Sequence, residues 1–216
     1  DFLERKEMLE IIHEKFKAGG YIRSGFECYS LPNSPMTKAF NDGEAHYGAS
    51  GHQPGGRVNF VAVGSSSMSN LGNDYYVQNF YDIPSYKKAL DQNKLPSFRG
   101  MRLNEDDKIR QHATQQIRSY FKIDYKNFSD QFGINAKEYF KNEIKYLDEM
   151  QKDSLLEITD KGIFLTEIGR DFTQNIMNVF DKYDPPNKSY KERLETVKKA
   201  KESQASVQEK IDFVST

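Results

Sequence analysis

The feature that most constrains this 216-residue chain is the uneven distribution of its glycines. Seven of the fourteen lie between Gly43 and Gly72, and few follow. Dense glycines indicate backbone that turns tightly or approaches a ligand closely, although a mobile surface loop has the same composition. Long glycine-poor stretches favour helices. We therefore expect two units, residues 1–80 and residues 81–183, followed by a charged tail at residues 184–216.

The first unit has the pattern of an α/β fold. Apolar residues recur at helical spacing in residues 2–17, and Gly19-Gly20 ends that helix. Residues 21–29 are rich in aromatic and β-branched side chains, which predicts a strand. The apolar run at residues 58–63 predicts a second strand. A helix followed by a strand suggests the repeat of an α/β domain.

The second unit is predicted to be mainly helical. Asn104 is a good N-cap for a helix that buries one apolar face, and a short helix ends at Gly133. A longer helix is expected at residues 136–152, a β-hairpin at residues 155–166, and a last helix capped by Thr166. This order resembles a winged helix. The expected core positions are Ile109, Ala113, Ile117, Phe121, Tyr139, Phe140, Ile144, Leu147, Met150, Ile168, Phe172, Ile176 and Phe180.

Composition argues against several classes of protein. The net charge of −1 provides no field that would draw the chain to nucleic acid or an anionic membrane. The longest apolar stretch is too short to cross a bilayer. A lone cysteine, Cys28, leaves no internal disulfide and no site with three or four thiolates, and it fits a reducing cytoplasm. A metal site from His46, His52 and Cys28 is conceivable, but their spacing matches no ligand template.

Three features could carry chemistry without any reference to a family. The run Gly64-Ser65-Ser66-Ser67-Met68-Ser69 could cradle an anion or a ribose after a strand. Glu27, near the end of its predicted strand, could face a ligand, or it is a solvated carboxylate. Arg99 and Arg110 could bind carboxylates, or they form ion pairs with neighbours such as Asp106 and Asp107. These features specify no reaction.

A series of short motifs, in one order and spacing, resembles the family of oxygen-independent coproporphyrinogen III oxidases. The resemblance covers roughly residues 20–183. Its ending looks like the oxidases proper, and not like their shorter haem-chaperone relatives. The motifs are Gly25-Phe26-Glu27-Cys28-Tyr29, Gly43, Gly51, residues 64–69, Tyr76 with Gln78-Asn79, Leu95-Pro96 with Arg99-Gly100, Asp106-Asp107, Leu165-Thr166 with Gly169-Arg170, Asn175 and Phe180-Asp181.

The resemblance implies oxidative decarboxylation of two propionates of coproporphyrinogen III to vinyl groups, giving protoporphyrinogen IX in anaerobic haem biosynthesis. A reduced 4Fe-4S cluster would cleave S-adenosyl-L-methionine to the radical that starts the reaction. The cluster cysteines of the family are absent from this chain, which begins at Asp1 and reads as a C-terminal fragment without activity of its own. The implied protein is cytoplasmic and monomeric, with an unknown electron donor.

The resemblance also implies a fold and a site. The fold is the last β/α elements of an incomplete radical SAM barrel, followed by a mainly helical, winged-helix-like domain with a small β-hairpin. The residues expected to face the cofactor or the substrate are Glu27, Ser50, Gly51, Ser66 and Met68; no metal ligand is assigned. The sequence departs from the family beside Gly51, where Ala49-Ser50 replaces Phe-Gln and His52-Gln53 replaces Tyr-Thr.

Two other functions remain open at this point. The altered segment at residues 49–53 allows a related radical SAM enzyme that acts on haem or another tetrapyrrole. A different class is a non-enzymatic module in which residues 100–183 bind a partner or nucleic acid as a winged helix. The acidic start of the helix at residues 105–121 does not suit nucleic acid, because a recognition helix is usually basic.

Overall fold

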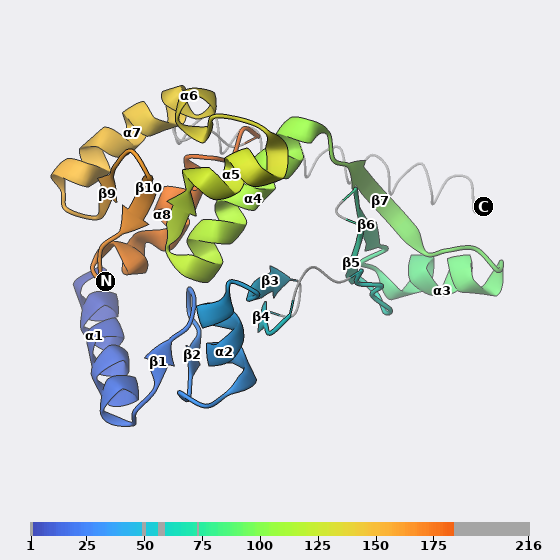
Figure 1. Ribbon diagram of the computed structural model, residues 1–216. Coiled ribbons are helices and arrows are strands. Elements are labelled where there is room, and N and C mark those ends of the chain that lie inside the picture. Colours follow the sequence, from blue (N-terminus) through green and yellow to red (C-terminus); the bar gives the residue numbers. More distant parts are fainter. Residues whose placement is uncertain (1, 49–50, 56–58, 73, 184–216) are drawn as a thin grey trace.

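The computed structural model of the chain describes residues 2–48, 51–55, 59–72 and 74–183. It contains both helices and antiparallel sheets, and the expected α/β class is confirmed. The first elements follow one another in a row of small units below the other helices in Figure 1. They are α1 (Phe2–Ala18), the hairpin β1 (Ile22–Arg23) and β2 (Tyr29–Ser30), α2 (Pro35–Asp42), and the hairpin β3 (His46–Gly48) and β4 (Gly51–Gln53).

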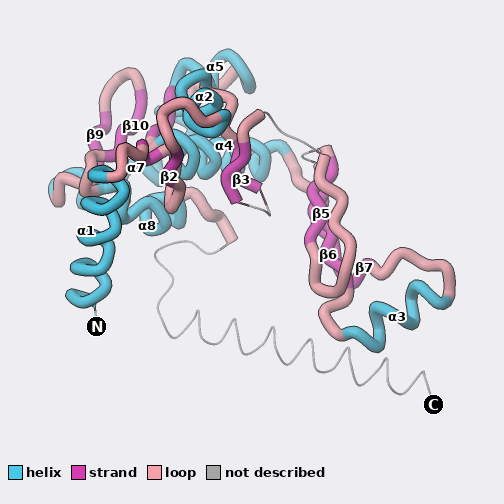
Figure 2. The backbone as a smooth tube through the Cα atoms, turned by 90° about the horizontal axis from the view of Figure 1, so that it is seen from below, coloured by secondary structure: helices cyan, strands magenta, loops and turns pink. Residues whose placement is uncertain are grey.

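A three-stranded antiparallel sheet follows, in the order β5-β6-β7. With helix α3 it extends away from the remainder of the chain, as Figures 1 and 2 show from two directions. Its elements are β5 (Met68–Leu71), β6 (Tyr75–Asn79), α3 (Ile83–Asp91) and β7 (Ser97–Arg102). The sheet joins residues on both sides of position 80, so the expected domain boundary there falls inside it and stays a prediction.

The second half is a helical module around a small sheet in the order β8-β10-β9. Its main core includes Ile117, Phe128, Leu147, Ile163 and Phe180, all nearly inaccessible to solvent. The elements are α4 (Glu105–Tyr120), β8 (Lys122–Asp124), α5 (Tyr125–Phe132), α6 (Ala136–Tyr139), α7 (Lys141–Lys152), β9 (Leu156–Ile158), β10 (Gly162–Leu165), a 3₁₀ turn (Gly169–Phe172) and α8 (Thr173–Asn178).

Helix α4 begins where the sequence predicts. The Asn104 side chain accepts a hydrogen bond from the Asp107 amide at 2.9 Å, and the Asp107 carboxylate accepts one from the Asn104 amide at 2.9 Å. This reciprocal pair satisfies two amides that the helix start would otherwise leave without partners. The predicted apolar face is buried from Ile109 to Phe121, and the short helix after it ends at Gly133 with φ 66°.

The expected strand at residues 21–29 is wrong. Two-residue strands pair antiparallel there, Ile22 with Ser30 and Arg23 with Tyr29, around a turn. Gly25 has φ 140° and Glu27 has φ 56°, conformations that a continuous strand does not contain. The aromatic composition of this segment therefore marks a hairpin, and Glu27 lies in its exposed turn and not at a strand end.

Three other expectations from the sequence differ from the structure. The run at residues 58–63 is not a strand where it is described: Phe60 forms an isolated bridge with Asn70, and Val63 is 86% exposed. The helix expected at residues 136–152 is interrupted at Phe140, which separates α6 from α7. The side chain of Phe140 is buried at this break. Tyr139 and Ile168, both expected in the core, are exposed.

The hairpin at residues 155–166 is confirmed as β9 and β10, with Ile163 opposite Ile158. Strand β8 adds a third strand that periodicity over three residues does not reveal. Thr166 caps the turn that follows, since its hydroxyl accepts from the Gly169 amide at 3.0 Å. The expected tail at residues 184–216 lies outside the described residues. No helix within the described parts is long and apolar enough to cross a membrane.

Gly169 permits the closest approach between the 3₁₀ turn and the β-hairpin. A Cβ atom there would lie 1.6 Å from the carbonyl oxygen of Leu155, which is backbone and cannot move alone. We expect Gly169→Ala to lower the free energy of unfolding by about 3 kcal/mol, measured by urea denaturation. In the control Gly133→Ala the added methyl group lies in open space. Only the positive φ is unfavourable there, so the free energy of unfolding should fall by about 1 kcal/mol. Equal losses in the two variants would contradict this account.

Candidate ligand site at the junction of the two halves

A cavity of about 600 Å³ lies where the β3–β4 hairpin, the β5-β6-β7 sheet and the helical module meet. Its size is in the range of small-molecule sites. Apolar side chains come from all three parts, and polar ones come mainly from one face of α4. The apolar and aromatic lining comprises Tyr47, Phe60, Met68, Tyr76, Met101, Leu103, Met177 and Phe180.

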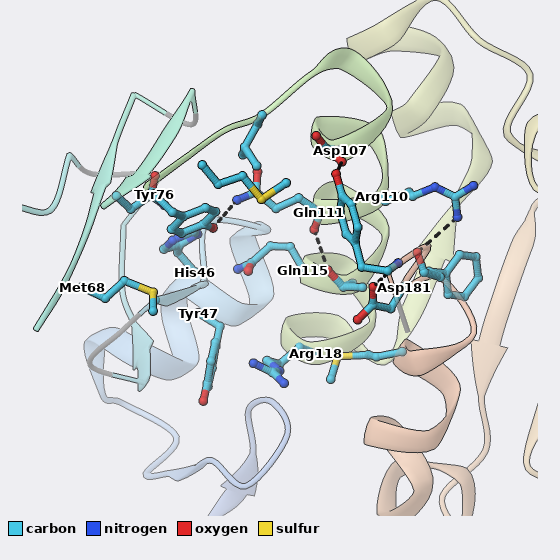
Figure 3. A pocket seen from close by; sticks show the side chains of 18 of the residues that line it. His46, Tyr47, Met68, Tyr76, Asp107, Arg110, Gln111, Gln115, Arg118 and Asp181 are labelled. Carbon is cyan, nitrogen blue, oxygen red and sulfur yellow. Dashed lines mark hydrogen bonds between the residues drawn. The ribbon is translucent and has the colours of Figure 1, made fainter. Parts of the chain in front are cut away.

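The polar face of α4 supplies Gln111, Gln115 and Arg118, which Figure 3 shows in a row along the helix. The spacing of four and then three residues places them on one side, away from the buried Ile109 and Ile117. Gln111 donates a hydrogen bond from Nε2 to the hydroxyl of Tyr76, which ties the sheet to the helix. Its Oε1 is buried and has no hydrogen-bond partner among the described residues, so within that part of the structure this amide has an unused acceptor.

Arg118 is held by two contacts on different elements. Its guanidinium lies over the ring of Tyr47, with Cζ 4.2 Å from the ring centroid. Its Nη2 donates to Oε1 of Gln174, at 3.1 Å, at the start of α8. Stacking on an aromatic ring and a planar hydrogen bond together fix the orientation of a guanidinium. Figure 3 shows Arg118 and Tyr47 directed toward each other in the cavity.

The residues after α8 are bound to the start of α4 through Lys182 and Tyr183, a contact that we call the clasp. Lys182 Nζ lies 2.6 Å from Asp107 Oδ1 and 2.7 Å from Asp106 Oδ2, and the Tyr183 hydroxyl donates to Asp107 at 2.9 Å. Burial by itself raises the pKa of Asp107, but the hydrogen bonds from Lys182, the Asn104 amide and Tyr183 lower it overall. The carboxylate is therefore ionised at neutral pH, and it closes one end of the cavity.

Hairpin β3–β4 is anchored to the module by Tyr120. The Tyr120 hydroxyl donates to the carbonyl of Ala45 at 2.7 Å. Burial raises the pKa of this phenol to about 12, so it stays a neutral donor at physiological pH. The anchor sets the position of Tyr47, two residues further on, beneath Arg118.

Of the four expected site residues that the structure describes, one lines the cavity. Met68, at the first position of β5, is part of the lining and is 43% exposed. Gly51, with φ 91°, lies in β4 opposite Gly48 and next to the lining, and Ser50 lies outside the described residues. Ser66 is in the turn before β5 with φ 59°, and Glu27 is in the β1–β2 turn; neither lines the cavity. The four described residues do not meet in the cavity, and the roles of all five stay predictions.

The histidines and Cys28 have other partners. His52 Nε2 bonds the carbonyl of Phe26 at 2.8 Å, and burial lowers the pKa of this imidazole. Cys28 Sγ lies 3.4 Å from the Ser24 hydroxyl. Among the described residues, no three His, Cys, Asp or Glu side chains gather as metal ligands would.

The two arginines singled out from the sequence differ in role. Arg110 is an ion-pair residue: its Nε lies 3.0 Å from Asp106 and its Nη1 2.8 Å from Glu143. Arg99, on the exposed edge of β7, donates to Gln78 at 2.8 Å. Arg110 is therefore already paired with carboxylates, and Arg99 lies outside the cavity lining.

Sequence reasoning missed Tyr47, Gln111, Gln115 and Arg118. The last three carry a signal, because long polar side chains recur at residues 111, 115 and 118 beside the apolar stripe of the same helix. An exposed helix face has the same pattern, so the stripe alone does not identify a cavity. Tyr47 carries no signal in the sequence, since its contact with Arg118 joins residues 71 positions apart.

Comparison with known proteins identifies what this arrangement is similar to. Residues 103–172 match the family model described as the HemN C-terminal domain. An oxygen-independent coproporphyrinogen III oxidase from Pseudomonas aeruginosa is 32% identical over 182 residues, 84% of this chain and 39% of that protein. The enzyme of the same name from Escherichia coli is 28% identical over 186 residues, 85% of this chain and 40% of that protein.

A solved structure supports the same relationship. It is described as coproporphyrinogen III oxidase (HemN) from Escherichia coli, a radical SAM enzyme, and it superposes with a TM-score of 0.77 at 28% identity. The match covers 81% of this chain and 40% of that one. The resemblance drawn from the motifs is confirmed, and the chain spans about two fifths of the length of these relatives.

Asp107 takes part in the helix cap and in the clasp and also lines the cavity, so its replacement should lower the stability of the fold. We expect Asp107→Asn to lower the free energy of unfolding at pH 7 by about 2 kcal/mol, because it leaves the Lys182 charge with one partner fewer. Since the folded-state pKa of Asp107 is lowered, its stabilisation is present above the ordinary value of 3.8 and is lost as the pH falls below it. The difference between wild type and variant should shrink in that window.

Denaturant unfolding at pH 7 and at pH 3 measures this difference. Asp148→Asn, an exposed position on α7, is the matched control and should change stability by less than about 0.5 kcal/mol. A loss in D107N that is the same at both pH values would contradict a role for the ionised carboxylate.

Proposed function

We propose that this chain is the C-terminal part of an oxygen-independent coproporphyrinogen III oxidase, which converts coproporphyrinogen III to protoporphyrinogen IX by radical S-adenosyl-L-methionine chemistry. The observation that carries the proposal is the similarity to HemN over 81% of the chain, which includes elements on both sides of the cavity. If this chain shared only its helical module with otherwise unrelated proteins, the similarity would stop at that module.

The proposal extends to architecture. We assign residues 1–80 to the last β/α elements of a radical SAM barrel and residues 81–183 to a winged-helix-like domain. Helices α4 and α5 with the three-stranded sheet β8-β10-β9 support the winged-helix description. In that arrangement the helical domain covers the mouth of the barrel, where ligands of α/β barrels bind.

The residues of this chain do not fit the iron-sulfur cluster. A 4Fe-4S cluster takes three or four thiolates, whereas the sequence contains Cys28 alone. Cys28 is only partly accessible and lies beside Ser24. This chain therefore does not supply the cluster ligands of the proposed enzyme, and no step of the reaction is assigned to the cluster.

What this chain supplies is binding and the exclusion of water. Met68, Phe60 and Met101 give the cavity an apolar wall on which a planar group can pack. Gln111, Gln115 and Arg118 provide amide and guanidinium donors on the opposite side. A ligand buried against these side chains would be shielded from solvent on the sides that they cover. Among the residues expected from the family, Met68 and Gly51 support this role by position, and Ser50, Ser66 and Glu27 remain part of the proposal.

A related enzyme that acts on haem or another tetrapyrrole is the second candidate. The sequence at residues 49–53 favours it, because Ser50 stands where the family has Gln and cannot make the two hydrogen bonds of an amide. The winged-helix interaction module has less support: three acidic residues begin α4, and Asp106 and Asp107 pair with Lys182, so this end offers no basic surface.

An anaerobic assay of the full-length parent protein tests the proposal. With reconstituted cluster, a reductant, S-adenosyl-L-methionine and coproporphyrinogen III, we expect 5′-deoxyadenosine and protoporphyrinogen to form together. Deoxyadenosine without protoporphyrinogen would indicate the related enzyme with another substrate. If neither product forms with an intact cluster, the proposed activity is wrong.

Met68 gives a point test of the site. In the full-length protein, Met68→Asp places a carboxylate on the apolar wall, where a ligand would bury it, and we expect kcat/KM to fall about tenfold or more. Leu95→Asp is the matched control, because Leu95 is 85% exposed and outside the cavity lining. Unchanged kinetics for M68D would remove Met68 from the site.

A further inference from the structure

Arg118 differs from the other half-buried arginines of the described chain. Arg23 pairs with Asp171 at 2.8 Å, Arg110 with Glu143 at 2.8 Å, and Arg170 with Glu167 at 3.0 Å. Within the described ranges, Arg118 lies within ion-pair distance of no carboxylate, and its one side-chain hydrogen bond is to the neutral amide of Gln174. A partly buried cation without an anion is costly unless a ligand supplies the charge.

Among the described residues, no acidic side chain of the lining pairs with Arg118. Asp107 binds Lys182 and Tyr183, and Asp181 accepts a hydrogen bond from the Tyr183 amide at 2.8 Å. Arg110, the other guanidinium of the lining, pairs with Asp106 and Glu143. Arg118 is therefore the lining guanidinium that has no ion-pair partner within the described structure.

The guanidinium is also oriented in advance. Its flat face rests on Tyr47, at 4.2 Å from Cζ to the ring centroid, and Gln174 engages one of its amino groups. Tyr47 is itself on the hairpin that Tyr120 anchors through Ala45. The Nε of Arg118 is buried without a hydrogen-bond partner among the described residues, so the donors that remain for a ligand are on the two amino groups. A pair of such donors can bind a carboxylate in a bidentate manner.

The remaining lining specifies what kind of carboxylate fits. Outside α4 the lining combines an aromatic and aliphatic wall with polar side chains, and its volume of about 600 Å³ suits a ligand that has both an apolar body and polar arms. A porphyrinogen has this combination: four pyrroles joined by methylene bridges form an apolar macrocycle, and propionate arms place carboxylates at its rim.

We propose that Arg118 binds a propionate carboxylate of the tetrapyrrole substrate and acts as a positioning residue, an inference that rests on the function proposed above. Held at this point, the ring lies against the apolar wall that contains Met68 and Tyr76. The interaction selects carboxylate-bearing tetrapyrroles and takes no part in the electron or proton transfers of the reaction.

A binding measurement on the full-length protein tests this apart from turnover. The probes are coproporphyrin III, which has four carboxylates, and its tetraamide, which has none; binding is followed by porphyrin fluorescence. We expect Arg118→Gln to weaken binding of the tetra-acid roughly tenfold to a hundredfold and that of the tetraamide less than about twofold. Arg118→Lys should lie between, because it retains the charge but not the fork.

Arg102→Gln is the matched control. It removes the same charge from β7, on an exposed residue outside the cavity lining, and should leave both affinities unchanged. A second variant, Gln174→Glu, places a carboxylate beside Arg118. We expect Gln174→Glu to weaken tetra-acid binding while the thermal unfolding temperature stays the same or rises. This variant tests the proposal even if R118Q does not fold.

The outcomes separate the two proposals. Equal affinity of R118Q and wild type for the tetra-acid would overturn the role of Arg118, and the proposed activity would stand if the anaerobic assay gives product. An equal loss for tetra-acid and tetraamide would also overturn it, because the effect would not depend on the carboxylates. If the wild-type protein does not bind coproporphyrin III, the role of Arg118 is overturned, and the anaerobic assay with coproporphyrinogen III decides the proposed activity separately.

Discussion

The two-sided packing of helix α4 is the constraint on which the rest of the structure depends. Its apolar stripe, from Ile109 to Ile117, is buried in the core of the helical module, where the helix contacts β8 and α8. Its other side contacts β3 and lines the cavity. Because side chains three and four residues apart share a face, the register that buries Ala113 also turns Gln111 and Arg118 toward the cavity.

The start of α4 fixes that register in space. The reciprocal bonds of Asn104 and Asp107 stop the helix from beginning earlier or later, and Lys182 binds the same carboxylate. A shift of one residue along the helix would rotate the polar side chains by about 100° and remove them from the cavity. The clasp therefore couples the end of the described chain to the orientation of the ligand-facing side chains, although it lies well away from Arg118 along the helix.

Much of the helical module follows from local signals in the sequence. The cap at Asn104, the helix end at Gly133 and the β-hairpin at residues 155–166 each depend on residues close together in the sequence, and all three are confirmed. Segments whose structure depends on distant partners are not predictable in this way. Strand β8 exists because Ile123 pairs with Ile163, and residues 21–29 form a hairpin because a glycine and Glu27 adopt positive φ. Aromatic composition does not distinguish a hairpin from a strand.

The candidate site was harder to predict for a related reason. A charged residue is informative as a ligand contact only when its internal ion pairs are known, and these join distant positions: Arg23 with Asp171, Arg110 with Glu143. From the sequence alone, Arg110 and Arg118 are equivalent residues two turns apart on one helix. The structure separates them, since one is neutralised by two carboxylates and the other rests on Tyr47 with an amide as its only hydrogen-bonding side-chain partner among the described residues. Unpaired charge in an apolar cavity is thus the property that distinguishes a binding group from a structural one, and it emerges only when the fold brings the two halves together.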